Sequence, residues 1–124
     1  MELEIPKSYK WFVREQLTKF VPWHFYETLE LKSDINERFK TEDNSNREVV
    51  TFGHRQDMDT YAGFEIINGK VCENIIVFHP SFQKNTADWS IIENEYLDFI
   101  QFMRNQVLQD VNEWIEDEYE TETK

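Results

Sequence analysis

The sequence predicts an α+β fold, in which an antiparallel meander of about three to five strands is flanked by an N-terminal helix and a long C-terminal helix. Alternating apolar segments in the middle of the chain are typical of strands. Apolar residues at three- and four-residue spacing near both ends indicate amphipathic helices. With 124 residues, the chain has the length of a single domain, residues 1–124.

The predicted meander begins with two strands, residues 49–54 and 60–67. The polar, aspartate-containing segment 55–59 between them suits a connecting turn. A third strand, residues 71–79, follows Asn68-Gly69, which is a strong signal for a two-residue hairpin. Because side chains alternate across a strand, one face of the first two strands is predicted to face the core. The residues on that face are Val50, Phe52, Ala62, Phe64 and Ile66.

The predicted N-terminal helix starts at Pro6 and ends before Pro22, because proline suits a first helical turn but interrupts a helix interior. Residues 27–32 form a candidate short strand. Ser33 is expected to cap a short helix at residues 34–40, since its hydroxyl can accept an amide of the first turn. The apolar side of the first helix is Tyr9, Phe12, Val13, Leu17 and Phe20.

The last predicted helix covers residues 94–115. At about 33 Å it is longer than a small sheet can cover, so its end is expected to project. The residues after it, from about 116, form an acidic tail, either solvated and frayed or an interaction tail that needs a basic partner. Residues 41–47 and 80–87 are predicted loops. The apolar stripe of this helix is Tyr96, Ile100, Met103, Val107, Val111 and Trp114.

The net charge of −12 argues against direct binding to nucleic acid or to an anionic membrane, because both attract Lys and Arg. It favours a basic protein partner, although acidity also simply confers solubility. Cys72 is the single cysteine, so no internal disulfide forms and a reducing compartment is favoured. It is expected to be an inert core residue. With neither a signal sequence nor a membrane-spanning segment in view, a cytoplasmic location is expected.

No catalytic constellation is convincing, and the chain is not expected to be an enzyme or to need a cofactor or metal. His54, Asp57 and Asp59 have ligand and acid-base chemistry, but their spacing is nonspecific and an aspartate-rich turn explains it. A small hydrolase or metal-dependent enzyme built on these three residues remains an alternative. His24 and His79 have no partner at sequence level.

Residues 5–13 (IPKSYKWFV) and 50–59 (VTFGHRQDMD) are two local strings that carry a family resemblance. They resemble the SUKH superfamily, which includes bacterial toxin-immunity proteins and related cell-wall-regulator-like domains. Residues 5–13 (IPKSYKWFV) are similar to its L-P-x-S-Y-K-x-F-L opening, and residues 50–59 (VTFGHRQDMD) to its strand and aspartate-containing turn. Residues 76–79 (IVFH) and 95–100 (EYLDFI) occupy the places of its next strand and of the start of its final helix. Two features depart from the family pattern: only four residues precede Ile5, and no Gly-rich turn follows the first helix.

The resemblance implies a small α+β domain with a binding function. It implies an immunity protein or antitoxin that captures a cognate toxin, such as a nuclease, by occluding its basic active-site surface. The acidic charge points the same way, because an acidic surface can imitate the phosphates that such a groove expects. The alternative is a regulatory or scaffolding module of the same superfamily that neutralises nothing. The oligomeric state stays open.

The candidate partner-binding residues are Asp57 and Asp59 in the turn, Glu65 and Glu73 on the strands, and Trp23 in the aromatic segment 23–26. Acidic side chains around an aromatic anchor are expected at a tight interface. The alternatives are structural: Trp23 closes one end of the core, and the two glutamates mark the solvated face of the sheet.

Overall fold

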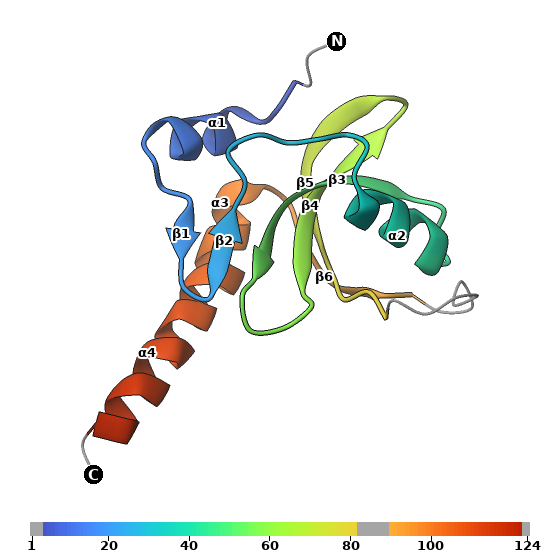
Figure 1. Ribbon diagram of the computed structural model, residues 1–124. Coiled ribbons are helices and arrows are strands. Elements are labelled where there is room, and N and C mark those ends of the chain that lie inside the picture. Colours follow the sequence, from blue (N-terminus) through green and yellow to red (C-terminus); the bar gives the residue numbers. More distant parts are fainter. Residues whose placement is uncertain (1–3, 82–89, 123–124) are drawn as a thin grey trace.

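The fold is described by a computed structural model, which covers residues 4–81 and 90–122. One antiparallel sheet contains six strands, and each strand pairs with the next one along the chain (Figure 1). The predicted α+β class and antiparallel meander are confirmed, with six strands in place of three to five. The strands are β1 Lys19–Phe20, β2 Trp23–Phe25, β3 Glu48–Arg55, β4 Tyr61–Ile67, β5 Lys70–Phe78 and β6 Ile92–Tyr96.

The central strands β3, β4 and β5 match the predicted meander closely. Asn68 and Gly69 have φ values of 52° and 78°, as a hairpin turn with two left-handed central residues requires. At Gly53, close packing rather than the backbone angle requires glycine. A Cβ there would lie 2.7 Å from the Phe25 ring and 2.9 Å from the His24 carbonyl oxygen, so its absence lets β2 approach β3.

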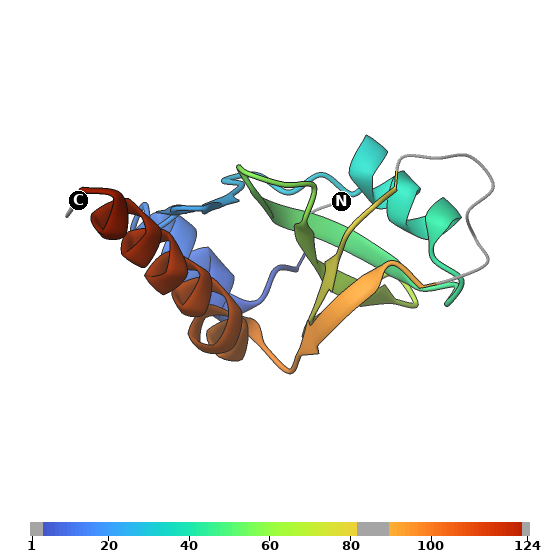
Figure 2. The ribbon, with the colours of Figure 1, turned by 90° about the horizontal axis from the view of Figure 1, so that it is seen from below.

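Two apolar clusters lie on the two faces of the sheet. Figure 2 shows helices on both sides of the central strands. The predicted core-facing residues of β3 and β4 all lie in the larger cluster, together with Tyr9 of α1 (Lys7–Arg14) and with Phe99 and Phe102 near the C-terminus. The opposite face packs Val49 and Ile76 against Phe39 of α2 (Asp34–Glu42). Both faces of the central strands are therefore covered, by different helices.

Helix α1, Lys7–Arg14, is shorter than predicted and ends well before Pro22. Gln16 has a φ of 63°, and the amides of Gln16 and Leu17 donate to the carbonyls of Val13 and Phe12. These two bonds form the left-handed C-terminal cap that ends many helices. Because the chain turns there, Leu17 is 38% exposed and Phe20 belongs to β1 rather than to the helix.

Helix α2, Asp34–Glu42, starts where predicted, and the Ser33 hydroxyl accepts the amide of Asn36. It extends into the predicted loop at 41–47. Residues 27–32 are not a strand, which corrects the prediction. The reason is local, because the Asn36 side-chain amide donates to the carbonyls of Glu30 and Leu31 at 2.9 and 2.8 Å and so takes the place of a neighbouring strand.

The long C-terminal helix starts at Phe99 rather than at residue 94. It runs through α3 Phe99–Phe102, a π-helical turn η1 Met103–Val107, and α4 Leu108–Glu122. Residues 94–96 belong to β6, where Glu95 lies opposite Ile76. The Asp98 carboxylate accepts the amide of Gln101 and begins the helix. A π turn adds one residue to the helical repeat and so rotates the residues before it relative to those after it. Ile100, predicted on the buried stripe, is therefore 50% exposed.

Helix α4 extends beyond the sheet, as predicted from its length (Figure 1). The acidic segment from 116 continues it as helix to Glu122, which corrects the expectation of a frayed tail. Of the predicted loop 80–87, residues 82–87 lie outside the described residues. None of the helices in the described ranges has the length and apolar character needed to cross a membrane.

Candidate partner-binding site

The turn between β3 and β4 carries Asp57 and Asp59, both exposed, but their surroundings differ. Arg55 donates from Nε and Nη2 to the two carboxylate oxygens of Asp57, each at 2.9 Å. The Asp59 carboxylate makes no hydrogen bond or ion pair with any residue in the described ranges. Asp57 is therefore neutralised in place, whereas the charge of Asp59 is available to a partner.

The turn forms one wall of a pocket of about 450 Å³. Met58 lies at its edge and is 47% exposed, so a flexible apolar side chain stands next to the Asp59 carboxylate. Flexible methionines adapt to the shape of a binding partner. The pocket is lined by His54, Arg55, Gln56, Asp57, Met58, Asp59 and Tyr61.

Next to this turn, a histidine–tyrosine row made of His24, His54 and Tyr61 crosses three strands. The strand register places His24 opposite His54, and His54 opposite Tyr61. The two imidazoles stack at 5.9 Å between ring centroids, with an interplanar angle of 15°, and the Tyr61 ring lies 6.0 Å from that of His54. All three side chains are half-buried, so they present ring atoms to solvent while their neighbours hold them in place.

Hydrogen bonds hold the row in place. The Tyr26 hydroxyl lies 2.8 Å from Nδ1 of His54, and Nε2 of His24 lies 2.6 Å from Oε1 of Gln56. Burial lowers the pKa of His54, and the neighbouring His24 lowers it further. Burial also raises the pKa of Tyr26 to about 12. At neutral pH, His54 and Tyr26 are therefore uncharged, and Asp59 supplies negative charge at the edge of the site.

Trp23 is a core residue, which corrects its predicted place at a binding surface. It has no exposed area, and its indole Nε1 donates to the buried Asp110 carboxylate at 2.8 Å. The Arg55 guanidinium reaches the same Asp110 oxygen at 3.2 Å. Arg55 therefore contacts both Asp57 and Asp110, and it links the turn to α4.

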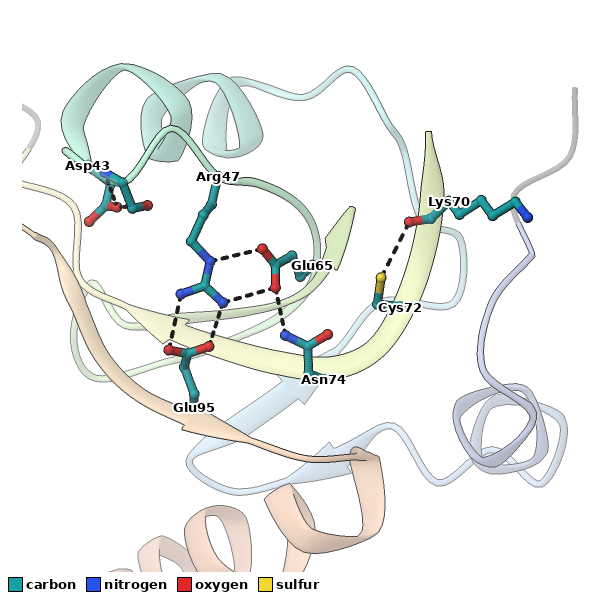
Figure 3. Close-up of polar contacts among 8 residues, drawn as sticks. Asp43, Arg47, Glu65, Lys70, Cys72, Asn74 and Glu95 are labelled. Atoms are coloured by element: carbon teal, nitrogen blue, oxygen red, sulfur yellow. Dashed lines mark hydrogen bonds and ion pairs between the residues drawn. The ribbon is translucent and has the colours of Figure 1, made fainter. Parts of the chain in front are cut away.

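Glu65 is also held by the protein itself (Figure 3). It accepts hydrogen bonds from Nε and Nη2 of Arg47, each at 2.9 Å, and from the Asn74 amide at 2.8 Å. The opposite side of the Arg47 guanidinium contacts Glu95 at 3.0 Å. The bonds from Arg47 hold the pKa of the Glu65 carboxyl below its usual range. Glu65 thus organises the sheet surface rather than serving a partner.

Glu73 is exposed on β5 and has no hydrogen-bond or ion-pair partner in the described part of the chain. It lies near the end of β5 that joins the hairpin turn at Asn68, whereas Asp59 precedes the opposite end of β4. At about 3.3 Å per residue, the six residues from Asp59 to Glu65 span about 20 Å. The structure therefore brings Asp57 and Asp59 together and separates them from Glu65 and Glu73.

Sequence reasoning included Tyr26 only as part of the aromatic segment 23–26, missed Tyr61 as a site residue, and gave His24 and His54 no shared role. The signal was strand alternation within residues 23–26. Trp23 and Phe25 face the core, so His24 and Tyr26 are directed to the opposite face. Reading that segment as a strand would have identified the half-buried pair His24 and Tyr26, although the neighbouring strand that completes the row is set only by the sheet.

The other polar candidates offer less. No group of three or more His, Cys, Asp or Glu residues within 4–81 and 90–122 is arranged to hold a metal ion. Cys72 is half-buried on β5 rather than a full core residue, and its thiol lies 3.7 Å from the Lys70 carbonyl (Figure 3).

The chain was compared with protein-family models, with curated proteins and with solved structures, and no match was found in any of the three.

Proposed function

We propose that this chain is an immunity protein that binds and neutralises a cognate bacterial toxin, such as a nuclease, by occluding its basic active-site surface. The observation that carries the proposal is the turn site, defined as Met58, Asp59, Tyr61, His54 and Tyr26. Here an exposed carboxylate with no described partner stands beside half-buried rings and a flexible methionine. A lysine or arginine of a toxin would meet both a negative charge and aromatic surface, the two features that attract a cation.

Charge over the whole chain supports the same partner. With a net charge of −12, long-range attraction accelerates encounter with a basic protein and repels nucleic acid that would compete for the toxin. Neutralisation by occlusion requires shape and charge complementarity but no chemistry. A regulatory or scaffolding role for the same surface is the alternative, and it differs in having a partner that is not toxic.

The first experiment is affinity capture from the native host with the tagged chain, washed at low and at high salt, followed by mass spectrometry. A basic protein bound in equimolar amount, toxic when expressed alone and harmless when this chain is co-expressed, is the expected result. Stable capture of a non-toxic regulatory protein, with a candidate toxin present in the same cells, would favour the scaffolding role instead.

The placement of the interface is tested on the captured toxin with Asp59→Lys. We expect its Kd to rise at least about tenfold and to depend less on salt, because an attractive charge becomes a repulsive one. Glu113→Lys on α4 makes the same charge change on an exposed residue outside the turn site and is the matched control. Equal effects of the two variants would show that only net charge matters and would exclude this placement. Asp57 is unsuitable as a probe because reversing it also breaks its bond to Arg55.

A further inference from the structure

Helix α4 carries exposed apolar side chains along its length. Leu108, Ile115 and Tyr119 are 49%, 45% and 61% exposed. Their spacing places them along one side of the helix over about 16 Å, and we call them the α4 stripe. Side chains this large usually gather on a surface because another molecule covers them.

The acidic side chains of α4 are unfavourable for the helix that carries them. From Leu108 to Glu122 the sequence has no lysine or arginine, and the last turn holds no basic residue. Glu113 and Glu116 are both exposed and repel each other, because residues three apart are neighbours on a helix. A basic residue from another molecule would relieve this repulsion, and Glu116 lies beside the stripe.

Helix α1 has the complementary surface. Lys7, Lys10, Trp11 and Arg14 recur at three- and four-residue spacing and are all exposed, with Trp11 at 47%. We call them the α1 basic face. Lys7 and Lys10 have no hydrogen-bond or ion-pair partner among the residues described, and Arg14 contacts the adjacent Glu15. The α1 basic face therefore presents basic side chains around an exposed indole. It is complementary to α4, which is acidic and carries an apolar stripe.

Helices α1 and α4 both lie on the side of the molecule away from α2, and the free end of α4 points away from α1 (Figures 1 and 2). We propose that the chain forms a two-fold symmetric dimer in which the α4 stripe of each copy packs on the α1 basic face of the other. Two-fold symmetry makes this contact twice, so a modest attraction at each is doubled. At about 0.15 M salt the Debye length is about 8 Å, which screens repulsion between distant charges more than it weakens ion pairs in contact.

The dimer uses neither the turn site nor the toxin, so it is tested on the purified full-length chain alone. Sedimentation equilibrium at about 0.15 M salt is expected to show a concentration-dependent dimer. Lys10→Glu and Glu116→Lys each reverse one charge in both contacts and should raise the dimer Kd at least about tenfold. An equimolar mixture of the two variants should restore association, because one contact of the mixed dimer is native and the other has its charges exchanged.

Lys32→Glu is the matched control, since it makes the same charge change on an exposed lysine that precedes α2. It should leave the dimer Kd close to that of the unmodified chain, and circular dichroism confirms that each variant is folded. A chain that stays monomeric at millimolar concentration would overturn the proposal. So would a dimer that both charge reversals leave intact, or variants whose mixture fails to associate. None of these results bears on toxin binding through Asp59, so the two proposals can fail separately.

Discussion

At the scale of single residues, the same side-chain chemistry takes different roles according to its neighbours. Asp57 and Asp59 are two positions apart, yet Arg55 binds the first and no described residue binds the second. Glu65 is bound by Arg47 and Asn74, whereas Glu73 is exposed. The number of donors that reach a carboxylate therefore decides whether it organises the fold or remains available to a partner.

His54 makes stability depend on pH. Its folded-state pKa lies below the ordinary 6.5, so the unfolded chain binds this proton more readily, and the free energy of unfolding falls as pH drops below about 7. We expect His54→Gln to reduce the loss of melting temperature between pH of about 7.5 and 5.5. This window lies above the range in which Glu65 and Asp43, whose pKa values are lowered, would lose their contribution.

Thermal melting monitored by circular dichroism across this pH range measures the effect. His79→Gln removes an exposed imidazole from elsewhere on the sheet and is the control for the substitution itself. If the wild-type chain and His54→Gln lost melting temperature equally over the window, His54 would not be the group responsible.

At the scale of elements, a buried polar contact, surrounded by apolar side chains, attaches the C-terminal helix to the sheet. Asp110 is 8% exposed and accepts from Trp23 on β2 and from Gln106 one turn earlier, each at 2.8 Å. Arg55 at the end of β3 completes its surroundings. A single carboxylate therefore joins α4, β2 and the end of β3, and it also orients the helix that projects beyond the sheet.

Asp110→Ala is expected to lower the free energy of unfolding by about 3 kcal/mol, because it leaves the buried indole N–H of Trp23 without its acceptor and removes one of the two carboxylates that contact the Arg55 guanidinium. Urea denaturation followed by tryptophan fluorescence measures this change. Asp110→Asn keeps one acceptor oxygen and should cost less. A loss below about 1 kcal/mol for the alanine variant would mean that water replaces the carboxylate, and that the contact does not anchor α4.

At the scale of the whole molecule, charge and packing act in opposite directions. The two apolar clusters on either side of the sheet stabilise the compact state. The net charge of −12 opposes it, because folding concentrates negative charge that the unfolded chain spreads out. A net charge of this size thus has a cost in stability.

Raising the salt concentration should therefore stabilise the folded chain. We expect the melting temperature to rise by several degrees between about 0.01 M and 0.2 M sodium chloride, as the Debye length shortens from about 30 Å to less than 10 Å. A second monovalent salt at equal ionic strength distinguishes screening from specific ion binding. A fall in melting temperature would instead show that native ion pairs, such as Arg47 with Glu65, outweigh the repulsion.

Local patterns in the sequence were sufficient for the central meander, its core-facing residues, the Asn68-Gly69 turn and the Ser33 cap. Each of these depends on residues that are neighbours in the chain, so a short window contains the whole cause. The acidic turn at Asp57 and Asp59 was predicted for the same reason.

Only the tertiary structure decided the features that join distant segments. Residues 94–96 have helical spacing but form β6, because pairing with β5 outweighs local preference. Trp23 is buried because Asp110, far along the chain, accepts its indole N–H. His24, His54 and Tyr61 meet through strand register. The sequence by itself determined the central strands β3 to β5 and where charge lies; packing between segments decided the remaining strands and which side chains remain available to a partner.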